Sequence, residues 1–401
     1  MKKVRVSIIA MMFASVLVFS CNKGNGPGVG AGQLPGASIA DINSSEGNAA
    51  TKAFVFEVTL SKSHSAPVSV SYKTINGTAK SGEDYTSAEG TVTIQPGVTK
   101  AAISINVIGD EIREGEETFM IRLSNPTNCF LTRETAVATV TNDDTKIAIT
   151  NNGFDAPSSY AGYTLKWNDE FNGTVLDQTD WSYEVGDGCP NLCGWGNNEL
   201  QYYTPGTDNL FFQDGKMIIE AKQQSIGTRN YTSARIKTQG KKSFKFARID
   251  IRAKLPIGKG IWPAVWMLPQ NNVYGTWPKS GELDILEYLG HEPGKVHGTL
   301  HFGPGPGSTQ ITKSLTLNTG TFNDEFHVFS IEWKQDQIQW LVDGNVYSTA
   351  TKAAFGTNNY PFNEEFYLLL NMAVGGQWPG NPDATTSFPQ WFIIDYVRVY
   401  Q

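Results

Sequence analysis

Three carboxylates in one short apolar segment are the side chains of this sequence best placed to do chemistry. Glu282, Asp284 and Glu287 stand among aliphatic residues in segment 281–288, which reads Gly-Glu-Leu-Asp-Ile-Leu-Glu-Tyr. In a regular strand the side chains alternate between faces, so Glu282 and Asp284 share a face and Glu287 points the other way. One extra residue in a β-bulge at Ile285–Leu286 would return Glu287 to the face of the other two acids.

Acids held together on one face repel one another, and one class of reaction uses that repulsion. Hydrolysis of a glycosidic bond with retention needs one carboxylate to attack and a second carboxyl group to stay protonated, about 5–5.5 Å away. Neighbouring charge can raise one pKa and lower another, which separates the two roles. A solvent-facing strand with alternating acids, or a calcium site, is the alternative interpretation of this motif.

Tryptophans stand close to the acids in the sequence. Trp262 and Trp266 are four residues apart, so they share a face if they lie in a strand, and Trp277 leads into the acidic segment. Aromatic side chains beside a few polar groups are typical of a ligand cleft, and the C–H faces of a pyranose stack on indole. All three are candidate sugar-stacking residues, although Trp266 would fit equally well in a core.

The acidic segment resembles the bulged signature of glycoside hydrolase family 16, in its laminarinase-like (endo-β-1,3-glucanase) branch. The likeness extends over about residues 160–401. It includes the segments WNDEF (167–171), GWGNNELQYY (194–203), YTSAR (231–235), VHGTLH (296–301), AVGG (373–376) and DYVRVY (395–400). The resemblance implies a β-jelly roll with a long concave cleft, which agrees with the many short strand-like segments of this region.

The resemblance also assigns roles to the three acids. Glu282 is expected to be the nucleophile and Glu287 the general acid/base, while Asp284 hydrogen-bonds the nucleophile and tunes both pKa values. The substrate is expected to be a β-glucan polysaccharide of the laminarin type, cleaved at internal β-1,3-glucosidic bonds. No cofactor is expected to take part in catalysis.

Further substrate contacts follow from the resemblance. Arg235 is expected to hydrogen-bond a glucose hydroxyl, and Asn198 to lie on the non-reducing side of the cleft. His297 and His301 share a face by parity, and His301 is expected close to the acids, with a purely structural role as the alternative. Phe302, which stands where relatives often have tryptophan, could alter a subsite.

A structural calcium ion is a further expectation drawn from the resemblance. Glu170, the backbone carbonyl of Gly215 and Asp395 match positions that bind calcium on the convex face in relatives, and oxygen ligands suit this ion. Ordinary hydrogen bonding at the ends of the domain is the alternative. Such an ion would stabilise the sandwich and take no part in the chemistry.

Composition limits the classes of function. The 401 residues have a net charge of −7, only 18% are charged, and glycine, tryptophan and tyrosine are plentiful. No long basic run follows the first five residues, so nucleic acid is not an expected partner. This balance favours a strand-rich extracellular protein, expected to be a monomer, that acts on a neutral polysaccharide.

The first residues resemble an export signal. Basic residues at 2, 3 and 5 precede an apolar run over 6–19, so residues 1–20 are interpreted as a signal peptide. Cys21 follows in a context that resembles a bacterial lipobox, which predicts lipidation and anchoring in the cell envelope; a simple signal peptide is the alternative. Residues 21–36, rich in glycine, are expected to form a flexible tether.

The remaining cysteines fit an oxidising compartment. Cys189 and Cys193 are close enough in the sequence for a short-loop disulfide, and a zinc site would need further cysteine or histidine nearby. Cys129 then has no expected partner and is interpreted as a small buried apolar residue.

Residues 37–145 form a separate predicted domain. Short alternating strands separated by turn residues indicate an immunoglobulin-like sandwich, and several acidic motifs resemble the Calx-β domain. Its acids at 46, 84, 110, 111 and 144 could converge on calcium, or form a solvated acidic rim. Residues 146–160 are the predicted linker, and residues 161–401 the predicted catalytic domain.

The expected fold class is therefore all-β, with a Calx-β sandwich followed by a concanavalin-like jelly roll. The expected function is retaining endo-hydrolysis of β-1,3-glucan. A family 16 enzyme acting on mixed-linkage β-1,3-1,4-glucan or a galactan is one alternative. The other is a glycan-binding surface lipoprotein without catalysis.

Overall fold

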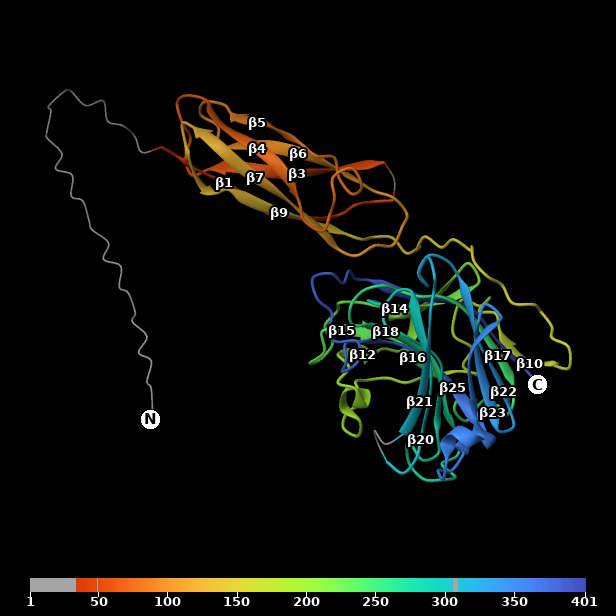
Figure 1. The fold of residues 1–401 in the computed structure, drawn as a ribbon. Coiled ribbons are helices and arrows are strands. Elements are labelled where there is room, and N and C mark those ends of the chain that lie inside the picture. The colour runs from red at the N-terminus through yellow and green to blue at the C-terminus, as the bar shows by residue number, and fades with distance from the viewer. Residues whose placement is uncertain (1–33, 49, 306–308) are drawn as a thin grey trace, which may run out of the picture.

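The computed structural model describes residues 34–48, 50–305 and 309–401, which form two β-sandwiches (Figure 1). The predicted all-β class is confirmed, since the helical elements in these ranges are short 3₁₀ turns. They are η1 (Cys193–Gly196), η2 (Gly206–Asp208), η3 (Lys352–Phe355) and η4 (Pro361–Asn363). In the part of the chain that the structure describes, no helix has both the length and the apolar character to cross a membrane. The predicted signal peptide, Cys21 and most of the predicted tether lie outside the described residues.

The N-terminal sandwich consists of two sheets, with strand orders β6-β3-β1-β8 and β2-β9-β7-β4-β5. The strands are β1 (Gly36–Ile39), β2 (Ile42–Ser45), β3 (Thr51–Leu60), β4 (Val68–Asn76), β5 (Glu89–Ile94), β6 (Lys100–Ile108), β7 (Glu117–Thr127), β8 (Phe130–Arg133) and β9 (Thr135–Thr141). Buried and exposed residues alternate along β3 and β6, because every second side chain faces the other sheet. Phe119 contacts the rings of Phe54, Phe56 and Tyr85 in this core, where Cys129 is also buried.

The C-terminal sandwich is larger and is built from a seven-stranded and an eight-stranded sheet. The seven-stranded sheet has the order β11 (Ser182–Tyr183), β16 (Arg235–Lys237), β25 (Phe366–Val374), β18 (Ile261–Pro269), β19 (Glu282–Tyr288), β20 (Lys295–Phe302) and β21 (Thr309–Thr316). The eight-stranded sheet has the order β13 (Leu210–Gln213), β14 (Lys216–Ala221), β26 (Gln390–Tyr400), β17 (Arg248–Lys254), β22 (His327–Lys334), β23 (Gln337–Val342) and β24 (Asn345–Thr351), and β10 (Leu165–Asp169) also pairs with β26. A small parallel pair joins β12 (Gln201–Tyr203) to β15 (Tyr231–Ser233).

The two large sheets enclose one hydrophobic core between them. In β25, Leu368, Leu370 and Met372 belong to this core, while Asn371 and Ala373, of opposite parity, line a cleft on the other face of the sheet. The strand period of two therefore separates the residues that hold the sandwich together from those that face the cleft.

The segment 146–160, predicted as a linker, packs against the catalytic sandwich. Ile147 packs with Ile218, Phe326 and Ile393, and Ala156 packs with Val328 and Tyr396, on the outer face of the eight-stranded sheet. The backbone N–H of Phe154 donates to the carbonyl of Phe326, and that of Ala156 to the Tyr396 hydroxyl. The linker thus covers a sheet face that would otherwise be apolar and exposed.

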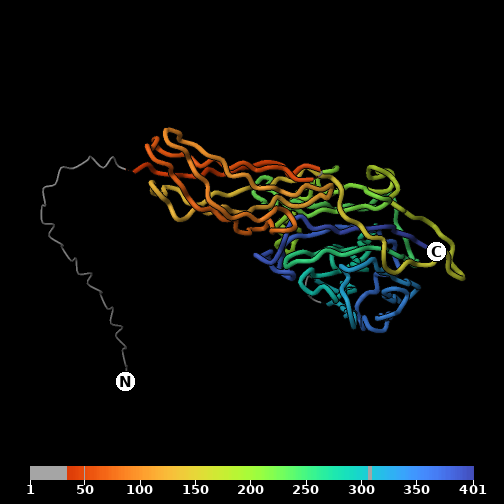
Figure 2. Tube along the Cα trace, turned by 90° about the horizontal axis from the view of Figure 1, so that it is seen from above, coloured from red at the N-terminus to blue at the C-terminus, as the bar shows by residue number. Residues whose placement is uncertain are grey.

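An ion pair connects the two sandwiches, which lie beside each other in the chain trace (Figure 2). The Arg113 guanidinium, from the loop between β6 and β7, donates Nε–H and Nη2–H to the two carboxylate oxygens of Glu220 in β14, both at 2.7 Å. The Glu220 side chain is completely buried, and it also accepts from the indole of Trp391. A Cβ at Gly115 would lie 2.3 Å from the carbonyl oxygen of Phe388, so the backbones of the two domains approach closely there.

Candidate active site

The β-bulge expected in the acidic segment is present in β19. Asp284 pairs with Thr299 and Glu287 pairs with His297, so three steps along β19 match two steps along β20. The register of β19 against β18 shifts at the same place. Ile285 and Leu286 are consecutive residues, yet both are buried in the core between the sheets. The extra residue resets the alternation and places Glu287 on the cleft face with Glu282 and Asp284.

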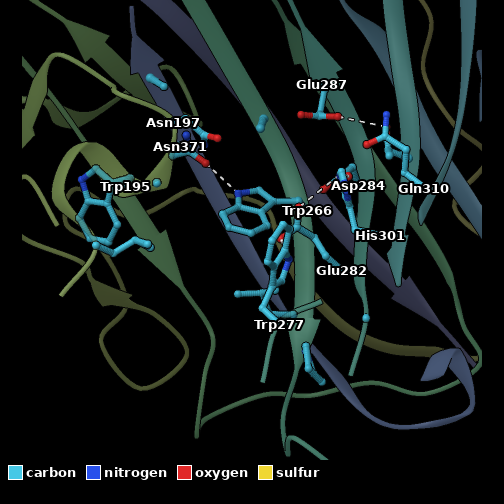
Figure 3. A pocket seen from close by; sticks show the side chains of 18 of the residues that line it. Trp195, Asn197, Trp266, Trp277, Glu282, Asp284, Glu287, His301, Gln310 and Asn371 are labelled. Atoms are coloured by element: carbon cyan, nitrogen blue, oxygen red, sulfur yellow. Dashed lines mark hydrogen bonds and ion pairs between the residues drawn. The ribbon is translucent and has the colours of Figure 1, made fainter. Parts of the chain in front are cut away.

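The three acids differ in their hydrogen-bond partners. Glu282 accepts a hydrogen bond from the indole Nε1–H of Trp277 at 2.8 Å, and its other oxygen lies 3.6 Å from Nε2 of His301. The same His301 nitrogen lies 3.4 Å from Oδ2 of Asp284. Glu287 accepts from the hydroxyl of Thr299 at 3.2 Å. His301 is therefore beside the acids, where the sequence placed it, and Glu282 is the acid that faces the most donors (Figure 3).

The pKa values of all three acids are raised. Burial, followed by the charges of Asp284 and Glu282, raises the pKa of Glu287 well above its usual value, and burial alone does the same for Asp284. Burial and the charge of Asp284 raise the pKa of Glu282 to about 8, against the lowering effects of His301 and the Trp277 N–H. The expectation that one pKa would be lowered is therefore not met.

These shifts still separate the roles of the acids. Once Asp284 holds a proton, its charge no longer raises the pKa of Glu282, while His301 and Trp277 still stabilise the Glu282 carboxylate. Among the described residues Glu287 accepts a side-chain hydrogen bond from the Thr299 hydroxyl, and burial with the neighbouring acidic charges raises its pKa, which favours its protonated form. The arrangement suits an ionised Glu282 and a protonated Glu287.

The acids lie in a cleft of about 1050 Å³ on the face of the seven-stranded sheet that is turned away from the core (Figure 3). Indole rings dominate its walls. Trp277 and Trp378 are 45% and 41% exposed, so each offers a ring face to a ligand, and Trp262 packs edge-on against Trp378 with ring centres 5.5 Å apart. The cleft-lining tryptophans are Trp195, Trp262, Trp266, Trp277 and Trp378.

Arg235 occupies a position between two of these rings. Its guanidinium lies 4.4 Å from the ring centre of Trp195 and 4.8 Å from that of Trp266, and its Nε is 2.5 Å from a carboxylate oxygen of Glu184. Stacking and the ion pair together explain how an arginine that is only 8% exposed is accommodated. Trp266 in turn donates its indole N–H to Asn371 at 2.7 Å, which fixes the ring in the cleft wall.

Comparison with known proteins agrees with this geometry. Residues 198–396 match the sequence profile described as "Glycosyl hydrolases family 16", and residues 40–150 match that of the "Calx-beta domain". The beta-glucanase of Rhodothermus marinus is 40% identical over 262 residues, which covers 62% of this chain and 89% of that protein. The chain belongs to glycosyl hydrolase family 16.

Two further relatives support the membership of this family 16 hydrolase. The glucan endo-1,3-beta-glucosidase A1 of Niallia circulans is 43% identical over 271 residues, covering 62% of this chain but only 39% of that longer protein. The laminarinase catalytic domain of Thermotoga maritima MSB8 superposes with a TM-score of 0.57 at 45% identity, covering 60% of this chain and 98% of that structure. The chain is thus a glycoside hydrolase, and its C-terminal sandwich has the jelly-roll architecture of these neighbours.

Asn198 is not among the cleft-lining residues, contrary to the prediction. It is exposed and has a left-handed backbone with φ of 57° in the turn after η1, whereas its neighbour Asn197 lines the cleft. Asn197 donates its side-chain amide to Glu199 at 3.1 Å. The left-handed backbone of Asn198 directs its side chain away from the cleft, so Asn197 is the asparagine that lines the cleft.

Phe302 also departs from its expected place. It is 1% exposed and packs against Phe355 with ring centres 4.0 Å apart, inside the core between the sheets. His301 faces the cleft, so strand parity sends the next residue to the other face. Phe302 therefore has no direct contact with a subsite.

Several cleft residues were not singled out from the sequence. They are Trp195, Thr299, Gln310, Asn371 and Trp378. Thr299 could have been found, because it shares the parity of His297 and His301 in one strand. Gln310 lies beside Glu287 in Figure 3, from the edge strand β21, and nothing in its local sequence marks it. Trp195 and Trp378 come from loops, whose position depends on tertiary packing.

The calcium set predicted from the resemblance does not fit an ion in this arrangement. Both oxygens of Glu170 accept from Arg398 at 2.8 Å, and the oxygens of Asp395 face Lys216 at 3.3 Å and Arg252 at 2.6 Å. A cation near either carboxylate would meet these basic groups. Glu170 and Asp395 instead form ion pairs with Arg398, Lys216 and Arg252.

The acids of the N-terminal domain fit a cation better. Glu46, Asp143 and Asp144 bring ligand atoms within 4.8 Å of one another, and so do Asp84, Glu114 and Glu117. Asp144 is 4% exposed, and its Oδ2 has no hydrogen-bond partner among the described residues. Of the acids predicted from the sequence, Glu111 instead faces Lys146 at 3.7 Å, and Asp110 accepts the N–H of Ile112.

The predicted disulfide between Cys189 and Cys193 is present and closes a loop beside the cleft. Within or next to this loop, Leu192 and Trp195 line the cleft, and the N–H of Leu192 donates to the carbonyl of Gly188. The cross-link therefore fixes one end of the cleft wall, including the tryptophan that stacks on Arg235.

Proposed function

We propose that this protein hydrolyses internal β-1,3-glucosidic bonds of laminarin-type glucans with retention of the anomeric configuration, acting as a monomer. The β-bulge that places Glu282, Asp284 and Glu287 on one face of an indole-lined cleft is the observation that supports this most directly. The printed names of the similar proteins, an endo-1,3-beta-glucosidase and a laminarinase, indicate the linkage.

The first step forms a covalent glycosyl-enzyme. A carboxylate oxygen of Glu282 attacks the anomeric carbon while the bond from that carbon to the glycosidic oxygen breaks, and the Glu287 carboxyl transfers its proton to the departing oxygen. The raised pKa of Glu287 keeps this proton available at neutral pH. The indole N–H of Trp277 and the His301 ring hold Glu282 in place.

The second step releases the sugar. Glu287, now ionised, takes a proton from a water molecule whose oxygen attacks the anomeric carbon, and the ester bond to Glu282 breaks. Two inversions restore the original configuration. Asp284 is 2% exposed and lies next to Glu282; burial raises its pKa, which favours its protonated form and limits the charge that accumulates in the cleft.

The cleft also accounts for the binding of a neutral polymer. Sugar rings stack on the exposed faces of Trp277 and Trp378, and the donors of Arg235 face the hydroxyl groups of a bound glucose unit. The cleft supplies no cluster of basic side chains among its described lining residues, which favours a neutral glucan over a sulfated galactan.

We further propose that the protein is exported and held in the cell envelope by lipid on Cys21, with the N-terminal sandwich as a spacer. The sequence before Cys21 supports this proposal. A Cys21→Ser variant is expected to leave the membrane fraction, as read by immunoblot of fractionated cells. Retention of that variant in the membrane fraction would refute lipid anchoring.

A reducing-sugar assay tests the activity. Wild type and Glu282→Gln are compared on laminarin, lichenan, agarose and carrageenan. The proposal expects release of short oligosaccharides from laminarin by the wild type and none by the variant. Faster cleavage of lichenan or a galactan would show that the proposed substrate is wrong. Binding of any of the four polysaccharides without cleavage would show that the protein recognises glycans and does not hydrolyse them.

A further inference from the structure

The backbone carbonyl of Asp284 has an unusual partner. A bulge disrupts the ladder of a strand pair and leaves backbone groups of the extra residue without their usual partner. This carbonyl is buried, and a buried carbonyl without a donor is costly. The carbonyl oxygen of Asp284, which lies directly before the bulged residues, accepts a hydrogen bond from the indole Nε1–H of Trp340 at 2.8 Å. Trp340 belongs to β23, so the bond crosses the core from the eight-stranded sheet to the cleft sheet.

The space for this bond is provided by a glycine. Gly298 lies in β20 between Thr299, the partner of Asp284, and His297, the partner of Glu287. A Cβ at Gly298 would lie 2.4 Å from Cδ1 and 2.5 Å from Nε1 of Trp340. A Cβ atom cannot approach ring atoms so closely, so only glycine at position 298 leaves room for the Trp340 indole to reach the bulge.

Trp340 is itself held firmly. It is 1% exposed and belongs to the core between the sheets, and β23 is paired on both sides by β22 and β24. The indole can therefore serve as a fixed reference for the bulge, since the surrounding core leaves it little freedom to move.

We infer that Trp340 is a positioning residue for the hydrolase: by holding the carbonyl of Asp284, it fixes the bulge that directs Glu287 into the cleft beside Glu282 and Asp284. The inference rests on the proposed function. Trp340 touches no substrate, because its side chain lies on the core side of the cleft sheet. It acts on the two acids through the backbone that separates them.

Loss of this bond affects chemistry more than binding. The sugar-stacking rings stay in place, whereas the bulge is free to relax and Glu287 shifts relative to the glycosidic oxygen. A displacement of about 1 Å of a catalytic group costs on the order of 10- to 100-fold in rate. Movement of Glu287 away from the ionised Glu282 also removes one of the charges that raise the pKa of Glu287.

The test compares two tryptophans of the same sheet. Trp333 in β22 is also 1% exposed, and its Nε1–H donates to the carbonyl of Phe362 at 2.7 Å, away from the acids. Trp333→Phe and Trp340→Phe therefore remove the same ring area and the same type of hydrogen bond. Kinetics on laminarin are measured over a range of pH, together with thermal unfolding of each variant.

Trp340→Phe is expected to lower kcat on the order of 10- to 100-fold with KM nearly unchanged, and to move the basic limb of the kcat profile to lower pH. Trp333→Phe is expected to lower the unfolding temperature about as much as Trp340→Phe does. Its kcat profile against pH is expected to stay that of the wild type. Equal kcat losses and unshifted pH profiles in both variants would overturn the inference.

A second substitution tests the hydrogen bond without changing the packing of the core, in case Trp340→Phe fails to fold. Benzothienylalanine at position 340 keeps the shape of the indole and replaces the N–H by sulfur, so it removes only the donor. It is expected to reproduce the kcat loss and the pH shift, and a wild-type profile would overturn the inference.

A crystal structure of the position 340 variant provides a readout without substrate. It is expected to show Glu287 displaced from the cleft face or the bulge rearranged, and an unchanged bulge would contradict the inference. If the wild type cleaves none of the glucans, the proposed function fails, and this structural readout still decides the role of Trp340.

Discussion

The indole nitrogen of Trp277 lies 2.8 Å from a carboxylate oxygen of Glu282, in a ring that is 45% exposed to the cleft. One side chain therefore combines two tasks, since its face is available for a sugar ring and its edge donates to the acid that attacks the sugar. The donor stabilises the ionised form of Glu282.

Trp277→Phe keeps an aromatic face and removes this donor. The loss of a hydrogen bond to a charged group, about 1.5–3 kcal/mol, predicts a fall in kcat/KM on the order of 10- to 100-fold. Because the N–H lowers the pKa of Glu282, the acidic limb of the kcat/KM profile is expected to move to higher pH.

Trp378→Phe is the matched control, because Trp378 is 41% exposed in the same cleft and contacts Trp262 and His297 but none of the acids. Trp378→Phe is expected to change KM without moving the acidic or the basic limb of the kcat/KM profile against pH. An acidic limb that stays in place in Trp277→Phe would show that the indole does not tune Glu282.

The ion pair between Arg113 and Glu220 predicts that the two domains stabilise each other. Glu220 is fully buried, so Arg113→Ala leaves its carboxylate without the guanidinium and with the Trp391 indole as a remaining hydrogen-bond donor. Removal of one partner of a buried pair costs about 3–5 kcal/mol. The unfolding of the catalytic domain, followed by tryptophan fluorescence against temperature, is expected to begin at a lower temperature.

Two further variants serve as controls for Arg113→Ala. Arg122→Ala removes an exposed pair with Glu134 and is expected to cost about 0–1 kcal/mol. The double variant Arg113→Met/Glu220→Gln is expected to recover much of the loss, because the buried carboxylate is gone and Lys222, the other basic neighbour of Glu220, is partly exposed to water. An unchanged unfolding temperature in Arg113→Ala would mean that the domains are not docked through this pair in solution.

Calcium is predicted to stabilise the N-terminal domain at high pH. Burial and neighbouring acids raise the pKa of Glu46 to about 7, and burial together with Asp84 raises that of Glu117 to about 8. These folded-state values exceed the unfolded ones, so the folded domain binds more protons between about pH 4.5 and 8, and its free energy of unfolding falls as pH rises through that window. A bound cation would offset this repulsion.

Differential scanning calorimetry with calcium or with EGTA, at pH 5 and pH 8, checks this prediction. Calcium is expected to raise the unfolding temperature at pH 8 and to change it little at pH 5. Glu117→Gln removes one charge and is expected to stabilise the EGTA form at pH 8 while reducing the calcium effect. A calcium effect that is unchanged in Glu117→Gln would show that the ion does not bind at Glu117.

The pair Asn197 and Asn198 gives a prediction about substrate binding. Asn197→Ala removes a polar group from the cleft, and loss of one hydrogen bond, about 0.5–1.5 kcal/mol, predicts a KM that is two- to tenfold higher on laminarin. Asn198→Gly keeps a residue that tolerates the left-handed backbone and is expected to leave KM unchanged. A larger effect from Asn198→Gly would restore the role first predicted for Asn198.

Local sequence patterns predicted the parts of this site that depend on strand parity. Strand parity predicts the shared face of Glu282 and Asp284 and that of His297 and His301. The bulge that brings Glu287 to the same face, and the nearness of His301 to the acids, were expected with the help of the resemblance to the family signature. The short disulfide loop also needed only sequence spacing.

Features that depend on distant segments could not be predicted in this way. The bond from Trp340 to Asp284 joins residues 56 positions apart across the core, and the acids that gather with Asp84 come from a loop and a strand end far along the chain. Asn198 was mispredicted because the left-handed turn after η1 changes which of two asparagines faces the cleft. Sequence patterns within one segment do not contain this information.

The identity of the nucleophile is the claim on which the mechanism depends, and covalent trapping measures it directly. A 2-deoxy-2-fluoro-β-laminarioligosaccharyl fluoride slows the release of the glycosyl-enzyme, and peptide mass mapping then locates the bound sugar. The structure predicts a single ester on Glu282, absent from Glu282→Gln. A sugar bound to another residue, or turnover with inverted configuration and no trapped ester, would contradict the account.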